Sequence, residues 1–237
     1  MRETNTILGL IHERGTKGLP LERVQRLLYT PDLYLTAYGK LYRNKGAMTE
    51  GTTEETVEGM SQEKIEQTIK ALRDGTFQWK PVRRVYIPKK DGKKRPLGLP
   101  DWPSKLVQEV IRLILNAYYE PQFSEHSHGF RPERGCHTAL RDIKKWDGTT
   151  WFIEGDISKC FDSLDHQVLL SILQEHIHDG PFMKLIRELL EAGYARGMEI
   201  SYDAQWYATR RSSKPTPGKH LPQQIGYIHR TRTHTRV

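Results

Sequence analysis

Pro81-Val-Arg-Arg-Val-Tyr-Ile-Pro-Lys-Lys-Asp-Gly-Lys-Lys-Arg-Pro-Leu-Gly98 is the most informative stretch of the sequence. The β-branched and aromatic residues from Val82 to Ile87 predict a strand, and Asp91-Gly92 predicts a turn. A second strand is predicted from Arg95 to Leu99, so the stretch forms a β-hairpin. Lysine and arginine dominate it, and the hairpin is therefore basic.

Helical patterns lie on both sides of this hairpin. Residues 19–47 carry aromatic and basic side chains at roughly helical spacing, and residues 49–58 have the polar composition of a loop. The apolar stripe from Leu106 to Tyr118 predicts the clearest helix. This helix opens at Pro103 and Ser104 and ends at Pro121. Other predicted helices are one capped by Ser61 and stopped by Gly75, a short one at 137–145, one capped by Asp165, and one from Pro181 to Gly193.

A carboxylate follows a short apolar run in the second half of the chain. Trp151-Phe-Ile predicts a buried strand that ends at Glu154-Gly-Asp156. An Asp at the end of a buried strand can hold a divalent ion at a cleft edge, and phosphoryl or nucleotidyl transfer uses such ions. The alternative interpretation is an ordinary cap or turn residue. We assign that role to Asp162 and Asp165.

Composition excludes several classes of protein. The chain has 237 residues, of which 36% are hydrophobic and 28% charged, as in soluble globular proteins. No run approaches the ~20 apolar residues that span a bilayer, and Met1-Arg-Glu-Thr-Asn lacks a secretory pattern. Two cysteines, Cys136 and Cys160, cannot form a disulfide framework or a four-cysteine zinc site. We therefore expect a cytoplasmic protein with no membrane contact.

Positive charge is concentrated in two places. Residues 80–105 contain nine Lys or Arg against two Asp, and residues 208–237 contain seven with no acid. The net charge of +8 therefore falls to +1 over the first 207 residues. Such stretches are typical of proteins that bind a phosphate-rich partner. The alternative is a solvated basic face or tail. Residues 209–237 have no apolar periodicity, which predicts disorder.

Four blocks of the sequence resemble the amino-terminal part of group II intron-encoded reverse transcriptases (maturases). The first combines residues 44–49 with 56–60 and resembles the family's amino-terminal extension. The basic hairpin resembles the first fingers block, and residues 105–135, with Ser127-His-Gly-Phe-Arg131-Pro, resemble the second. The block around Asp156 resembles the first palm motif. Together they cover residues 20–195 in the family's order.

The resemblance implies an α+β fold of reverse-transcriptase fingers with an incomplete palm. It divides the chain into an amino-terminal, helix-rich extension (1–60), fingers and partial palm (61–200) and a disordered basic tail (201–237). It also implies metal binding by Asp156 and by the backbone carbonyl of Ile157. Mg²⁺ is the implied ion.

Further roles follow from the same resemblance. Phe161 matches the aromatic gate against the nucleotide sugar, with a core aromatic as the alternative. Lys89 and Arg95 match the residues that hold the incoming triphosphate, with a merely solvated hairpin as the alternative. Arg131, with Arg134, matches a contact to template or nucleotide phosphate.

The sequence departs from the family pattern after residue 200. No Asp-Asp dipeptide occurs anywhere, although these polymerases complete the metal site with an aromatic-x-Asp-Asp motif. Several anionic ligands are needed to hold two Mg²⁺ ions. We therefore expect a chain that is truncated before this motif and inactive alone.

Two hypotheses remain open. The first is an RNA-directed DNA polymerase that uses an RNA template, a DNA primer, deoxynucleoside triphosphates (dNTPs) and Mg²⁺. The second is a non-catalytic, maturase-like remnant that binds group II intron RNA. The oligomeric state cannot be predicted from the sequence.

Overall fold

A computed structural model describes residues 2–44, 46–88, 92, 94–157, 160, 163–196 and 199–201. The helices are α1 (Arg2–Thr16), α2 (Val24–Leu27), α3 (Pro31–Tyr42), α4 (Gln62–Arg73), α5 (Trp102–Tyr119), α6 (Cys136–Ile143), α7 (His166–His176) and α8 (Gly180–Glu191). Two short 3-10 helices are η1 (Val57–Gly59) and η2 (Glu120–Gln122). The strands are β1 (Leu21–Glu22), β2 (Val82–Pro88), β3 (Lys94–Leu99), β4 (Ile177–His178), β5 (Tyr194–Arg196) and β6 (Glu199–Ser201). The predicted α+β class is confirmed.

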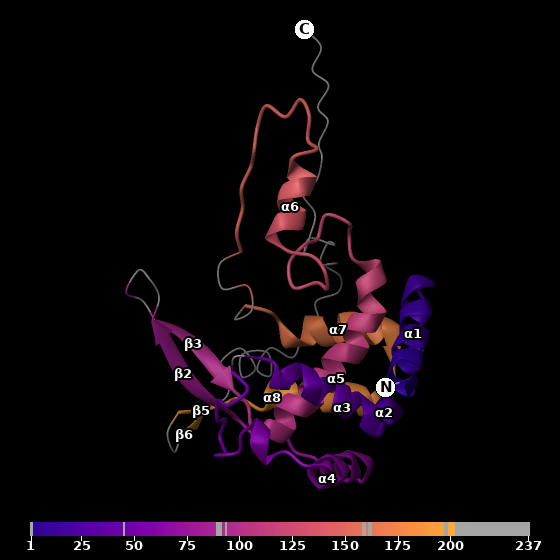
Figure 1. Ribbon diagram of the computed structural model, residues 1–237, viewed down its shortest axis with the longest axis vertical. Coiled ribbons are helices and arrows are strands. Elements are labelled where there is room, and N and C mark those ends of the chain that lie inside the picture. Colours follow the sequence, from indigo (N-terminus) through magenta and orange to yellow (C-terminus); the bar gives the residue numbers. More distant parts are fainter. Residues whose placement is uncertain are drawn as a thin grey trace, which may run out of the picture.

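Helix α5 lies at the centre of a helical body. Its residues Leu106, Val110 and Ile114 are fully buried and recur every four positions, so they lie on one face. Helices α1 and α3 pack against α5, and α8 contributes Phe182 to the same core. Figure 1 shows these helices grouped around α5. Each fully buried aliphatic side chain contributes about 1.5–3 kcal/mol to stability.

Four predicted helix ends agree with the structure, and the others differ by one or two residues. The Ser61 hydroxyl accepts a hydrogen bond from the Lys64 N–H at the start of α4. The Asp165 carboxylate caps α7 by accepting from two backbone N–H groups. Gly75 and Gly193 follow α4 and α8 with positive φ angles of 70° and 67°, the left-handed conformation that ends many helices. Helix α5 begins at Trp102, one residue before the predicted start.

The basic hairpin is formed as predicted. Strands β2 and β3 pair antiparallel, with Ile87 opposite Arg95 and Arg83 opposite Leu99. Strand β5 pairs parallel with the other edge of β2, and β6 follows, so the sheet order is β3-β2-β5-β6. In Figure 1 the hairpin extends from one side of the helical body.

Residues before position 60 share the core with those after it. Strand β1 pairs with β4, which brings Leu21 opposite Ile177. The Asp179 carboxylate accepts from the Gln25 N–H at 2.8 Å and from the Phe182 N–H at 3.1 Å. One side chain therefore joins the start of α2 to the start of α8. The predicted domain boundaries stay a prediction.

The strand predicted at Trp151–Ile153 is wrong. Residues 151–157 form neither helix nor strand, and Trp151, Phe152 and Ile153 are 85%, 65% and 92% exposed. A buried strand needs a hydrogen-bonded neighbour and a covering layer. The two sheets formed by the described residues do not include this segment. Its apolar side chains therefore stay in solvent.

Residues 123–157, which include α6, form an arm. Figure 1 shows α6 and its flanking loops extending away from the helical body. The short helix predicted at 137–145 is confirmed as α6, but none of its residues is buried. Of the predicted disordered tail (201–237), Ser201 ends β6, and residues 202–237 lie outside the described residues. Among the helices that are described, none has the length and apolar character needed to cross a bilayer.

Candidate nucleic-acid interface

The far end of the basic hairpin carries exposed cationic side chains. Lys94 and Arg95 are both exposed, and no hydrogen bond or ion pair joins their side chains to another described residue. The pairing of β2 with β3 fixes the positions at which these two side chains leave the backbone. Lys89, predicted beside Arg95, lies outside the described residues. The hairpin therefore presents at least two cations that are available to an external anion.

The base of the hairpin uses its arginines differently. Arg83 Nη2 donates to the Glu50 carbonyl at 2.6 Å. The Arg84 guanidinium lies 3.4 Å from the centre of the Tyr194 ring, a cation–π contact with β5. These two arginines hold the hairpin to its neighbours. The sequence predicted one basic surface, whereas the structure separates anchoring arginines from free cations.

The loop before η1 packs against this base. Lys105 Nζ donates to the Thr49 carbonyl at 2.7 Å, and burial lowers the pKa of Lys105. A Cβ at Gly51 would overlap the Pro100 carbonyl oxygen, so only glycine allows this approach. Lys80 Nζ lies 3.3 Å from a carboxylate oxygen of the buried Asp101. The segment 49–51 and the start of α5 thus pack against the base of the hairpin.

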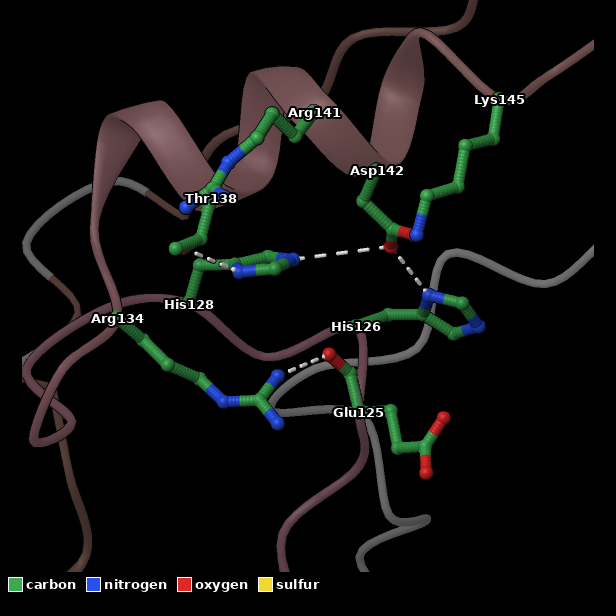
Figure 2. Close-up of a pocket in the computed structure, with 8 residues that line it drawn as sticks. All are labelled: Glu125, His126, His128, Arg134, Thr138, Arg141, Asp142 and Lys145. Atoms are coloured by element: carbon green, nitrogen blue, oxygen red, sulfur yellow. Dashed lines mark hydrogen bonds and ion pairs between the residues drawn. The ribbon is translucent and has the colours of Figure 1, made fainter.

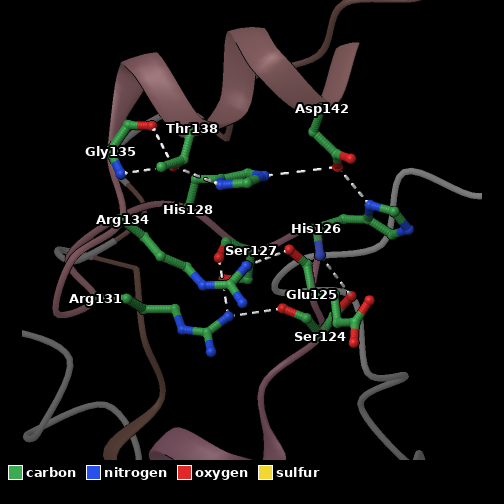
Figure 3. A network of polar contacts seen from close by, with 10 residues as sticks. All are labelled: Ser124, Glu125, His126, Ser127, His128, Arg131, Arg134, Gly135, Thr138 and Asp142. Carbon is green, nitrogen blue, oxygen red and sulfur yellow. Dashed lines mark hydrogen bonds and ion pairs between the residues drawn. The ribbon is translucent and has the colours of Figure 1, made fainter. Parts of the chain in front are cut away.

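Arg131 organises the loop at the start of the arm. Its Nε and Nη2 lie 3.0 and 2.8 Å from Glu120 Oε1, and its Nη1 donates to the Ser124 and Ser127 carbonyls at 2.7 and 2.9 Å. Figure 3 shows the guanidinium directed at these two carbonyls. The Arg131 side chain is 7% exposed, and all three nitrogens of its guanidinium have a partner within the protein. The geometry gives Arg131 a positioning role, and its predicted phosphate contact stays a prediction.

Two strained residues flank this arginine. Phe130 and Glu133 have φ angles of 58° and 56°, in the left-handed region that non-glycine residues rarely adopt. Phe130 is almost wholly exposed, so packing does not hold it there. The Arg131 side chain bonds back to residues 120, 124 and 127, and the Arg134 guanidinium, which follows Glu133, donates to the Glu125 carbonyl.

Asp156 and Ile157 lie in the exposed segment at the end of the arm. Phe161 and Asp162 are outside the described residues. Among the described residues, no hydrogen bond or ion pair joins Asp156 to Arg95 or Arg131, and only its chain neighbour Ile157 lies beside it from the predicted site. Within the described ranges, no group of three or more His, Cys, Asp or Glu side chains is arranged to hold a metal ion.

An open depression of about 420 Å³ lies between the loop and α6, and sequence reasoning missed it. Figure 2 shows its polar side chains, which come from both elements. They are Glu125, His126, His128, Arg134, Thr138, Arg141, Asp142 and Lys145. The polar positions 138, 141, 142 and 145 recur at helical spacing, a signal that could have indicated one polar face.

Comparison with known proteins gives a consistent set of relatives. A family model described as reverse transcriptase (RNA-dependent DNA polymerase) matches residues 87–217, more than half of the chain. The group II intron-encoded protein LtrA of Lactococcus lactis subsp. cremoris is 47% identical over 198 residues, which cover 82% of this chain and 33% of LtrA.

Two eukaryotic proteins are similar over shorter parts of their length. An uncharacterised 91 kDa protein in a cob intron of Schizosaccharomyces pombe is 44% identical over 196 residues, covering 80% of this chain and 24% of that protein. Nuclear intron maturase 1, mitochondrial, of Arabidopsis thaliana is 38% identical over 93 residues, or 39% and 13% of the two chains. The chain thus spans a third or less of the length of these relatives.

Proposed function

Since the chain belongs to the family of reverse transcriptases (RNA-dependent DNA polymerases), we propose that it supplies the fingers of a polymerase acting on group II intron RNA. In this proposal the chain binds an RNA template with its DNA primer and the incoming dNTP. The name of the bacterial relative supports an intron-encoded role. We place this activity in the cytoplasm, in agreement with the two free cysteines.

The observation that carries the proposal is the free cationic end of the hairpin. Lys94 and Arg95 are exposed and unpaired among the described residues, whereas Arg83 and Arg84 anchor the base. A guanidinium fork matches the oxygens of a phosphate group, and a lysine adds a point charge. A pair of hydrogen-bonded strands that carries cations near its end suits the binding of a phosphate chain.

The remaining site residues enter the proposal by resemblance. Lys89 and Arg95 would hold the triphosphate, and Phe161 would pack against the sugar. Asp156 and the Ile157 carbonyl would bind Mg²⁺, since the family implies a divalent metal. Arg131 would act on the template mainly by holding its loop.

The described residues alone do not fit a two-metal site. Asp156 is exposed, and no second carboxylate joins it in a metal-binding group within the part of the chain that is described. Two divalent cations close together repel each other and need several anionic ligands. This observation favours a second candidate function, in which the chain binds intron RNA without catalysing synthesis.

Primer extension separates the two candidates. The full chain would receive an RNA template, an annealed DNA primer, dNTPs and Mg²⁺, beside an Asp156→Asn variant. Extension that disappears in the variant supports a polymerase whose metal site includes Asp156. No extension, together with salt-sensitive RNA binding, supports the RNA-binding candidate.

The hairpin is tested in the same binding assay. Replacing Lys94 and Arg95 by glutamine should weaken RNA binding about tenfold or more and reduce the salt slope by roughly one for each phosphate that is no longer neutralised. Lys70→Gln removes an exposed charge from α4 and serves as the matched control. Equal affinity of the hairpin variant and the control would contradict the proposed surface.

A further inference from the structure

Two histidines share one carboxylate in the depression on the arm. His126 Nδ1 lies 2.6 Å from Asp142 Oδ2, and His128 Nε2 lies 3.7 Å from the same oxygen. The other ring nitrogen of His128 lies 2.9 Å from Thr138 Oγ1. Figures 2 and 3 show both rings directed at Asp142 from the loop. The residues that approach the rings come from the loop and from α6.

The network can form with both rings neutral. His126 then donates its Nδ1–H to Asp142, and His128 directs its Nε2–H to the same carboxylate. The Thr138 hydroxyl donates to His128 Nδ1. The hydrogen bond from His126 lowers the pKa of Asp142, so the carboxylate stays ionised as an acceptor.

The network also accepts two more protons. Thr138 Oγ1 lies 2.8 Å from the Gly135 carbonyl, so its hydroxyl can turn to that oxygen and accept from a protonated His128. The added proton of His126 sits on Nε2, and this side chain is 57% exposed. Each added proton therefore lies beside an acceptor oxygen or in solvent.

Charge around the rings favours an anion. Arg134, Arg141 and Lys145 face two acids, Glu125 and Asp142, across the depression. Protonation of both histidines would raise the excess of positive charge from one to three. Arg141 and Lys145 form no hydrogen bond or ion pair with another described side chain, and Arg134 is bonded only to the Glu125 carbonyl. Lys145 also interacts electrostatically with the Asp142 carboxylate, so Arg141 is the cation here with no partner among the described residues, while Lys145 and Arg134 keep unused N–H donors for a ligand.

We propose that this depression binds a phosphate group of RNA, and that it binds more tightly as His126 and His128 gain protons. Cationic and imidazolium donors around an open hollow match the several oxygens of a phosphate. A metal ion does not fit the same residues, because no metal-binding group occurs among the described side chains. RNA as the source of the phosphate rests on the proposed function. The site lies on the arm and is separate from the hairpin.

Binding of a short single-stranded RNA to the full chain tests this site. Fluorescence anisotropy at constant ionic strength should show about tenfold tighter binding at about pH 6 than at about pH 8, because each protonated imidazole adds a cation beside the phosphate. In the double variant His126→Gln, His128→Gln, the ratio should fall to roughly one to two. His178→Gln, an exposed histidine on β4, is the matched control and should keep the full ratio.

Two further variants identify the contribution of each surface. Arg141→Gln with Lys145→Gln should weaken binding at both pH values and lower the salt slope. The hairpin variant at Lys94 and Arg95 should weaken binding but keep the pH ratio. A pH ratio that survives in the double histidine variant, or that is absent from the unmodified chain, would overturn the proposed site.

A second probe separates failure of this site from failure of the proposed function. If RNA does not bind at either pH, the proposed function is wrong, and inorganic phosphate then tests the depression. Histidine ring signals in NMR, assigned with the single variants, should shift and saturate for His126 and His128 as phosphate is added. No shift at these two rings would overturn the site in that case too.

Discussion

Helix α5 buries half of its residues in the core, whereas α6 buries none. The body is held by apolar side chains from helices far apart in the sequence, and the arm is held by hydrogen bonds to Arg131, Asp142 and Thr138. Apolar packing is cooperative, while contacts of exposed polar groups each add little. The arm should therefore open locally at a much lower free energy than the body unfolds.

The largest effect should come from the core. Phe182→Ala removes a fully buried ring from α8 and should lower the free energy of unfolding by about 3–5 kcal/mol. Urea unfolding followed by circular dichroism measures this change. Phe130→Ala, at a side chain that is 98% exposed, is the matched control and should change stability by less than about 0.5 kcal/mol. Equal effects would contradict the division into body and arm.

A smaller effect is expected from Arg131→Ala. It leaves the half-buried Glu120 carboxylate and two loop carbonyls without their donor, which should destabilise the loop by about 2–3 kcal/mol. Hydrogen exchange should speed up at residues 123–135 and stay unchanged in α5. Arg131→Lys should not restore protection, because an ammonium cannot replace the guanidinium fork. Arg141→Ala, at an exposed residue of α6, should leave exchange in this loop as it was.

The Asp179 carboxylate, which links α2 to α8, should contribute less to the free energy of unfolding than Phe182 or Arg131. Asp179→Ala removes the acceptor for the Phe182 and Gln25 N–H groups and should cost about 1–2 kcal/mol. Asp179→Asn keeps one acceptor oxygen and should cost less than the alanine variant. Thermal unfolding of both variants gives the order. An alanine variant as stable as the original chain would show that this cap does not hold the two segments together.

Elements encoded by short-range patterns were predicted from the sequence. The basic hairpin follows from β-branched residues and the Asp91-Gly92 turn, and α4 follows from Ser61 and its apolar stripe. The sequence also predicts α6 as a helix, but it does not predict that every residue of this helix stays unburied. Whether an apolar face is covered depends on elements elsewhere in the chain, and local periodicity carries no information about them.

The candidate site shows the same limit. The sequence placed Arg95 on a basic hairpin, and the structure agrees. The sequence gave no sign that Arg83 and Arg84 anchor the base of this hairpin. The contact between His126 and Asp142 depends on the loop conformation that Arg131 sets. Resemblance singled out Arg131, but only the geometry shows that its guanidinium is engaged within the protein.

The smallest expected effect gives the sharpest contrast with the sequence prediction. Phe152 is 65% exposed in the arm, so Phe152→Ala should change the free energy of unfolding by less than about 0.5 kcal/mol. If Phe152 lay in the predicted buried strand, the same substitution would cost about 3–5 kcal/mol, as in the core. Urea unfolding of this variant beside Phe182→Ala compares one residue type in the two regions. A cost near that of Phe182→Ala would place residues 151–153 in a packed layer and would bring Asp156 with them to a buried edge, whereas a negligible cost means that Asp156 stands at the end of an uncovered segment.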